Sequence, residues 1–226
     1  MSARVTYDEG RRFAAVPRRG LRGGMLAVIA VLCALVAAYA LAIVVLPSMR
    51  PPLMQQRVDQ HPVPVMLHLA VGAMVIALAP LQLIAGIRRR WPVVHRWSGR
   101  AYAVGVLLSG VGGLALATVS QGGTPAHLGF AFLSLAWMAT TAIGVQRIRA
   151  GDVAEHRRWM VRSFALTFAA VTLRIYIPLS VATGLPYEPS YQAIAWLCWV
   201  PNLLVAEWLL RARRRPVQSP APLVAG

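Results

Sequence analysis

Six long apolar stretches set what this chain can fold into. They cover residues 25–46, 65–87, 99–119, 126–147, 159–181 and 190–210. An α-helix rises about 1.5 Å per residue, so roughly 20 apolar residues cross the hydrocarbon core of a bilayer. Because lipid offers the backbone no hydrogen-bond partner, such long continuous runs must be helical. The pattern predicts an all-α membrane protein with six transmembrane helices.

The composition and the charge distribution agree with this interpretation. Only 13% of the residues are charged, about half of what a soluble domain carries, which excludes an ordinary soluble enzyme. All 23 basic residues are arginine, and 20 of them fall before the first stretch, in 88–100, in 147–162 and in 211–215. These four segments share one side of the membrane, which the positive-inside rule places in the cytoplasm. We therefore expect a bacterial inner-membrane protein with cytoplasmic termini, whose net charge requires no nucleic-acid partner.

The chain divides into three parts by composition. Residues 1–24 form a basic cytoplasmic segment, residues 25–210 a single six-span membrane domain with its core at 65–181, and residues 211–226 a basic tail that we expect to be disordered. The first apolar run is longer than the roughly 7–15 residues of a signal peptide, so it is interpreted as a retained anchor.

Four of the five histidines open the second to fifth spans: His68, His95, His127 and His156. Since the helices alternate in direction, His68 and His127 are expected near the outer face, and His95 and His156 near the inner face. The spacing within the two pairs of consecutive spans is 27 and 29 residues, and the flanking residues are similar. Spans two to five therefore look like one helical hairpin used twice. A repeat axis along the membrane normal would make equivalent positions face each other across a four-helix core.

This arrangement matches the requirements of a haem that is held by two imidazoles. Each iron needs one histidine from each of two helices at the same depth, and the repeat supplies His68 with His127 and His95 with His156. Imidazole binds a metal only when it is neutral, and the positive end of a helix dipole disfavours imidazolium. A single histidine at a membrane boundary is more often a boundary residue than a ligand. The joint pattern nevertheless predicts two b-type haems, with irons roughly 20 Å apart along the membrane normal.

Six spans with histidines on spans two and four near one face, and on three and five near the other, resemble the cytochrome b561 family of transmembrane dihaem proteins. The resemblance covers residues 65–181. It implies electron transfer across the membrane by an oxidoreductase, from a donor such as quinol to ferric iron or a redox partner protein. The segment His95-Arg96-x-x-Gly99-Arg100-x-Tyr102 also resembles a signature of an uncharacterised bacterial integral-membrane family, which implies no substrate.

Arginines within or beside the spans are candidate partners for haem propionates. Arg174 lies about 15 residues, or roughly 22 Å, from the inner end of the fifth span. A charge at that depth costs about 2.5 kcal/mol or more unless it is paired or reaches the headgroups. It is expected either to bind a propionate or quinol near the outer haem or to snorkel. Arg96, Arg100 and Arg157 would serve the inner propionates, although membrane topology alone also explains them.

Two other functions are consistent with the sequence. The chain could be a haem-free membrane protein that binds or transports a small solute, or a structural membrane subunit. No pair of interrupted spans of the kind that transporters use is expected from the sequence, which counts against the first. Glu207, near the inner end of the sixth span, is expected to pair with arginines of the tail. A homodimer is common among such proteins.

Overall fold

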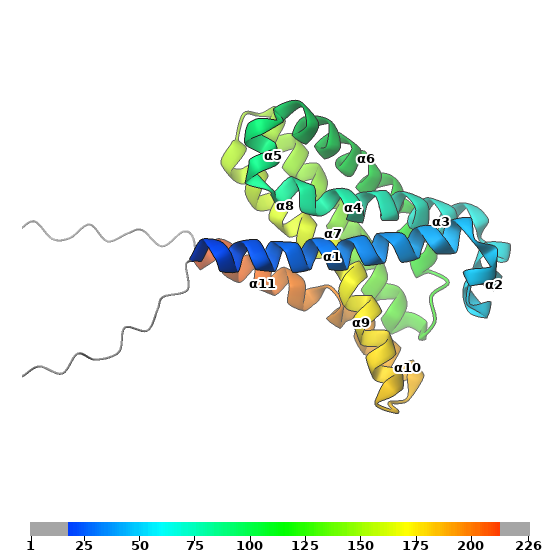
Figure 1. Cartoon of the computed structure of the whole chain (residues 1–226). Helices are drawn as coiled ribbons and strands as arrows, with labels where there is room; N and C mark the ends of the chain where they lie inside the picture. The colour runs from blue at the N-terminus through cyan, green and yellow to red at the C-terminus, as the bar shows by residue number, and fades with distance from the viewer. Residues whose placement is uncertain (1–17, 213–226) are drawn as a thin grey trace, which may run out of the picture.

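The computed structural model describes residues 18–212, with side chains from residue 23 onward, and that part of the chain is helical and contains no strand (Figure 1). Most of the predicted basic segment 1–24 and nearly all of the tail 211–226 lie outside the described residues. The elements are α1 (Arg18–Val45), η1 (Pro47–Met49), α2 (Pro52–Gln60), α3 (Pro62–Met66), η2 (Leu67–Val71), α4 (Gly72–Leu83), α5 (Ala85–Arg90), α6 (Pro92–Ala117), α7 (Gly123–Arg149), α8 (Val153–Thr167), α9 (Ala169–Ala182), α10 (Tyr187–Leu197) and α11 (Val200–Ala212).

Six segments of the described chain are long and apolar enough to cross a membrane: Gly23–Val45, Pro62–Leu83, Pro92–Ala117, Gly123–Arg149, Val153–Ala182 and Tyr187–Ala212. The predicted number of spans and the all-α fold class are thereby confirmed.

All six spans begin earlier than predicted, two of them by six or seven residues, and local features explain these two. α6 starts at Pro92 rather than at residue 99, because proline suits the first turn of a helix. α8 starts at Val153 rather than at residue 159, because the Asp152 carboxylate accepts the backbone N–H of Glu155 at 3.0 Å and caps the helix. His95 and His156 therefore lie in the first turn of their helices, as expected.

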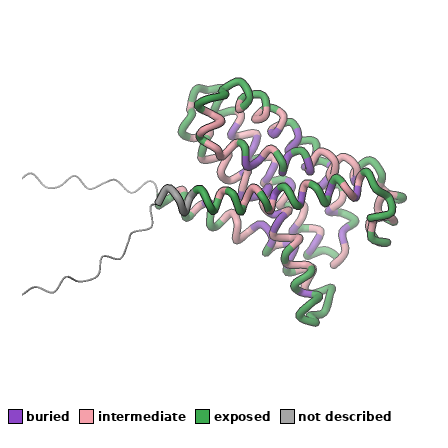
Figure 2. The backbone as a smooth tube through the Cα atoms, in the orientation of Figure 1, coloured by how far each residue is buried: buried purple, intermediate pink, exposed green. Residues whose placement is uncertain are grey.

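Spans two to five form the predicted core of four helices. α4 packs against α6, α6 against α7, α7 against α8, and α8 closes the ring on α4. α1 lies outside this ring against η2, α4 and α9, and α11 packs on α8 (Figure 1). Buried residues concentrate where the helices cross in the middle of the molecule, whereas the ends and the outer faces are exposed (Figure 2).

The two ends of the bundle differ in charge. We call the end that holds α5, the start of α6 and the turn between α7 and α8 the arginine-rich end, because residues 88–100 and 147–162 carry ten arginines. The described chain begins and ends on the same side as α5 (Figure 1). The opposite end holds η1, α2, α3, the turn between α6 and α7 and the turn between α9 and α10.

The fifth and sixth spans are each interrupted near their middle by a short turn. One residue, Phe168, separates α8 from α9, and residues 198–199 separate α10 from α11. Pro201 has no N–H to donate to the carbonyl of Leu197, which explains the second interruption. Phe168 and Cys198 keep helical backbone angles, and each span remains one segment long enough to cross a membrane.

Side chains satisfy the backbone groups at the second interruption. The hydroxyl of Thr172 and the amide of Asn202 both donate to the carbonyl of Cys198, the latter at 2.9 Å. An unpaired carbonyl in hydrocarbon would cost several kcal/mol. These two polar side chains therefore allow α9 and α10 to turn away from the core.

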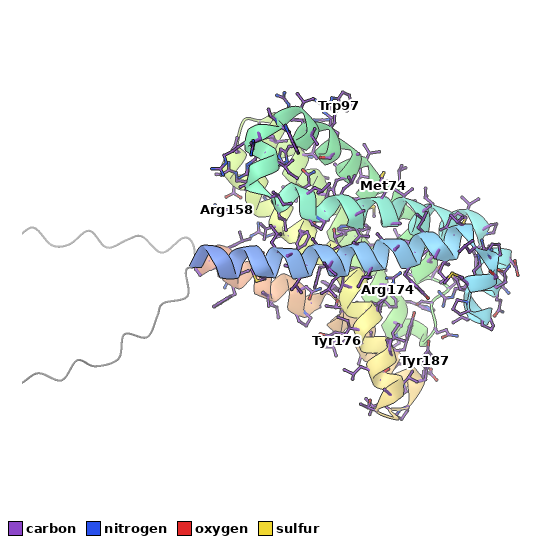
Figure 3. The ribbon with its side chains drawn as sticks, viewed as in Figure 1. Met74, Trp97, Arg158, Arg174, Tyr176 and Tyr187 are labelled. Carbon is purple, nitrogen blue, oxygen red and sulfur yellow. The ribbon has the colours of Figure 1, made fainter. Side chains whose placement is uncertain are left out.

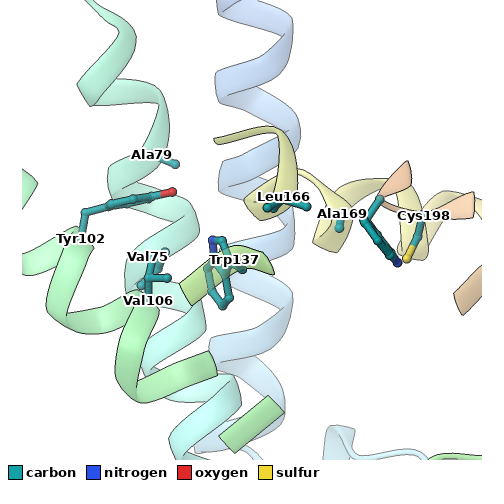
Figure 4. Close-up of a cluster of buried hydrophobic side chains, with 9 residues drawn as sticks. Val75, Ala79, Tyr102, Val106, Trp137, Leu166, Ala169 and Cys198 are labelled. Carbon is teal, nitrogen blue, oxygen red and sulfur yellow. The ribbon is translucent and has the colours of Figure 1, made fainter. Parts of the chain in front are cut away.

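The centre of the core is a cluster of buried, mainly apolar side chains (Figure 4). A buried hydrogen-bond network adjoins this cluster. The hydroxyl of Tyr102, on α6, is hydrogen-bonded to Ser163 at 2.8 Å and to Thr167 at 2.7 Å, both on α8. The indole of Trp137, on α7, donates to the Thr167 hydroxyl at 2.9 Å, and Thr141 is hydrogen-bonded to Ser163 at 2.7 Å. The network thus fixes three helices of the ring relative to one another.

At the arginine-rich end, a partly buried ion pair joins the core to the last span. The guanidinium of Arg162, on α8, binds both carboxylate oxygens of Glu207, on α11. The expected partners of Glu207 in the tail beyond residue 212 lie outside the described residues. Glu207 therefore holds α11 against the core, a role that was not predicted for it.

We expect the Tyr102→Phe substitution to lower the free energy of unfolding by about 1–3 kcal/mol, because it removes one partner from each of two buried hydroxyls. Reversible denaturant unfolding in detergent micelles would measure this. Tyr187→Phe is the matched control, because Tyr187 is exposed and donates to Gln121 at 2.7 Å. The control should change stability by less than about 0.5 kcal/mol. Equal effects of the two substitutions would contradict a structural role for the network.

Candidate functional site

A cavity of about 270 Å³ lies between the core and α1, in the half of the molecule toward the opposite end. α1, η2, α4, α6, α7 and α9 supply most of its walls, and α2 and α10 contribute Arg57 and Tyr191. The walls are mainly apolar side chains such as Val36, Leu69 and Leu133. A small number of polar groups within apolar walls is typical of a site for a small ligand or a cofactor.

His68 is the histidine that lines this cavity. It lies in η2, a single π-helical turn between α3 and α4. Such turns widen a helix locally and occur often at functional sites. The backbone carbonyl of His68 accepts the N–H of Gly72 and also the Ser109 hydroxyl of α6, the latter at 3.0 Å.

The same serine orients the imidazole. Nδ1 of His68 lies 2.9 Å from the backbone carbonyl oxygen of Ser109. Because a carbonyl can only accept, Nδ1 is the donor, and Nε2 of the neutral ring carries a free electron pair. This is the arrangement by which proteins orient a histidine that binds a metal through Nε2.

Two glycines of α6 make room for the histidine. A Cβ atom on Gly112 would lie 2.9 Å from the carbonyl oxygen of Pro64, and one on Gly113 would lie 2.9 Å from Nδ1 of His68. Both distances are too short for a real side chain. These glycines of the third span therefore permit the close approach of helices, and the lack of a side chain at Gly113 leaves room for the imidazole ring.

Arg174, on α9, lies in the cavity wall where α1 and α9 meet (Figure 3). Its Nη1 donates to the carbonyl of Ala170 at 3.0 Å, and its guanidinium carbon lies 5.6 Å from the ring centre of Tyr39, on α1. Its Nε is buried and has no hydrogen-bond partner among the described residues. Within that part of the chain, no carboxylate lines the cavity. A guanidinium in this environment retains an unused donor.

His127, the predicted partner of His68, does not belong to the lining of the cavity. Its Nε2 donates to the carbonyl of Ser120 at 2.8 Å, in the turn between α6 and α7. Ser120 itself lines the cavity. His127 is thus connected to the cavity through Ser120, and its pairing with His68 stays a prediction.

The other predicted pair lies at the arginine-rich end. Nδ1 of His156 donates to the carbonyl of Gly144, on α7, at 2.8 Å, which leaves Nε2 with a free electron pair. His95 is close enough to His156 for their charges to interact. Nδ1 of His95 is buried and has no partner among residues 23–212. These two imidazoles therefore lie near each other with ring nitrogens available.

The three arginines predicted beside the inner haem are exposed. Arg96, Arg100 and Arg157 all lie at the surface of the arginine-rich end, and the guanidinium of Arg100 stacks 4.8 Å over the ring of Trp97. None of them belongs to the lining of the cavity.

Arg57 and Ser109 were missed as site residues by the sequence analysis. Arg57 follows the first span in a polar segment where an arginine carries no signal, and only the packing of α2 brings it to the cavity. Ser109 offered a weak signal, because it is a hydroxyl residue next to three glycines within an apolar span.

Together the fold and the site define a six-span helical membrane protein with a mainly apolar cavity in one half, whose lining includes a few polar and charged side chains. The family model described as "Predicted membrane protein (DUF2306)" matches residues 65–210, and the chain belongs to this family. This bears out the resemblance to an uncharacterised membrane-protein family and gives no support to the resemblance to cytochrome b561. No curated protein and no solved structure matches the chain.

We expect Gly113→Ala to destabilise the protein by about 1–3 kcal/mol, because the added methyl group would overlap the imidazole of His68. Gly24→Ala is the matched control, since a Cβ atom there would meet nothing within 4 Å. Thermal unfolding of both variants in the same detergent would test this. A Gly113→Ala variant as stable as the Gly24→Ala control would contradict the described position of the His68 ring.

Proposed function

We propose that the protein transfers electrons across the membrane through two b-type haems. When bound, haem b supplies an iron that accepts and releases one electron. The observation that carries the proposal is that His68 and His156 each donate Nδ1–H to a backbone carbonyl of a neighbouring helix, at 2.9 and 2.8 Å. Each ring is thereby held in one orientation with Nε2 available as a ligand.

The residues around the cavity fit an outer haem in part. His68 offers a ligand nitrogen, the apolar walls suit a macrocycle, and the buried Nε of Arg174 suits a propionate. For His127 to bind the iron, its Nε2 would have to give up the hydrogen bond with the carbonyl of Ser120. His68 would then hold the group, Arg174 would orient it, and the walls would exclude water.

At the arginine-rich end, His95 and His156 would hold the inner haem. The buried Nδ1 of His95 without a partner is unusual, because nearly all buried polar atoms are hydrogen-bonded. A bound ligand that rotates the His95 ring, or that supplies a partner for its Nδ1, would account for this unpaired atom. Arg96, Arg100 and Arg157 remain proposed propionate partners there, although their side chains are exposed.

The distribution of arginine supports an orientation for this activity. We propose that the arginine-rich end faces the cytoplasm of a bacterial cell, since cytoplasmic segments carry the excess of basic residues. Electrons would then pass between a donor on one side, for which quinol is our choice, and an acceptor or redox partner protein on the other. A homodimer remains part of the proposal.

A haem-free function is the second candidate, and the interrupted spans favour it. α8–α9 and α10–α11 break near mid-membrane, and residues on both sides of the first break, Leu166 and Ala169, line the cavity. Interrupted helices beside a polar cavity are typical of proteins that bind or move small solutes. A purely structural membrane subunit would need neither the cavity nor the buried donor of Arg174.

The absorption spectrum of the purified protein distinguishes these functions. We expect protein from haem-replete cells to show the α band of a b-type haem in a reduced-minus-oxidised spectrum, because His68 and His156 offer oriented ligand nitrogens. His68→Ala should remove one of two haems and His156→Ala the other. His61→Ala is the control, since His61 precedes the second span and should change neither.

Two results would contradict the dihaem proposal. A colourless wild-type protein from haem-replete cells would leave only the haem-free candidates. Retention of both haems after replacement of His68 and of His127 would exclude the proposed outer ligands.

A further inference from the structure

The cavity holds a positive charge for which the described residues provide no acidic partner. Arg174 lies in the cavity wall, its Nε is buried without a partner, and the two salt bridges within the described residues involve Arg158 and Arg162 instead. A charge within the hydrocarbon region is costly unless a counter-group approaches it. Tyr39 covers one face of the guanidinium, but an aromatic ring cannot accept the free N–H in the guanidinium plane.

A second arginine reaches the same cavity. Arg57, on α2, lines it together with Tyr191 of α10, and the two side chains are close enough to interact. Arg57 and Arg174 come from segments more than 100 residues apart in the chain. No acidic residue of the described chain lines the space between them. The described lining thus carries two cations and no acid, so the cavity is complementary to a ligand that carries a negative group.

The remaining walls restrict what else the ligand can be. Apart from the two arginines, His68 and a few hydroxyl groups, the lining is apolar, with Leu69, Leu133 and Leu173 among its residues. A free inorganic anion would leave these walls without contacts. A ligand with an acid group at one end and an apolar body fits both parts.

We propose that Arg174 and Arg57 form an acid-group site that binds the ionised acid group of an amphipathic ligand, whose apolar body lies against the cavity walls. On the proposed function, the acid group is a propionate of the outer haem. In the absence of haem, it belongs to an acidic lipid that enters from the bilayer. The haem propionate and the acidic lipid would be recognised in the same way, because arginine binds a carboxylate through parallel N–H donors.

The first arm of the test uses a fluorescent long-chain fatty acid and its methyl ester as probes, with haem-free protein in neutral detergent. We expect wild-type protein to bind the acid at least about tenfold more tightly than the ester, which corresponds to about 1.4 kcal/mol. Arg174→Gln should abolish that preference and Arg57→Gln should reduce it. Arg149→Gln, which replaces an exposed arginine at the other end, is the matched control and should preserve it.

The second arm repeats the comparison with haem b and its dimethyl ester, added to haem-free protein and followed by absorption. A preference for the free acid that depends on Arg174 in this arm identifies the source as haem. A preference in the fatty-acid arm alone supports the acid-group site and contradicts the outer haem of the proposed function. The two proposals can therefore fail separately.

Two comparisons distinguish a variant that fails to fold from one that folds but has lost the acid-group site. Arg174→Lys keeps the charge but not the planar pair of donors, so it should retain part of the preference at unchanged thermal stability. The comparison of acid with ester in the wild-type protein needs no substitution. Equal binding of acid and ester by the wild type in both arms would overturn the proposal.

Discussion

In a membrane, every backbone polar group must find its partner within the protein, and the site depends on how this chain meets that constraint. In the π-helical turn, the carbonyl of His68 accepts the Ser109 hydroxyl in addition to a backbone N–H. The break in the sixth span frees a carbonyl that Thr172 and Asn202 satisfy. Each departure from a regular helix is thus paired with a polar side chain from a neighbouring helix. The cavity exists because these pairs make irregular backbone tolerable beside it.

The same contacts organise the chemistry of the cavity. Ser109 accepts from the imidazole of His68 and donates to its carbonyl, so one residue fixes both the ring and the turn that carries it. The network around Tyr102 borders the cavity through Trp137 and Thr167. A stable four-helix core therefore holds His68 in place, while Arg174 lies on α9, which turns away from that core. The histidine belongs to the rigid part of the molecule and the arginine to its peripheral hairpin.

Much of the fold could be predicted from sequence, because burial in lipid acts over whole stretches of about 20 residues. His68 and Arg174 could also be predicted, since a polar residue within an apolar run is visible by itself. The rotation of a helix about its own axis could not be predicted. The sequence therefore indicated the depth of His127 in the membrane but not its hydrogen bond with Ser120. Arg57 could not be predicted either, because its role depends on how α2 folds back over the bundle.

The position of α1 has a consequence for how a ligand reaches the interior. This helix precedes the segment that matches the family, which begins at residue 65, yet Val36 and Ala40 complete the cavity wall and Tyr39 covers Arg174. α1 packs against the rest of the bundle mainly along η2, α4 and α9 and belongs to neither core hairpin. A sideways displacement of this one helix would join the interior to the acyl chains of the surrounding leaflet. Loading could then proceed from within the bilayer, with no aqueous route and no rearrangement of the core.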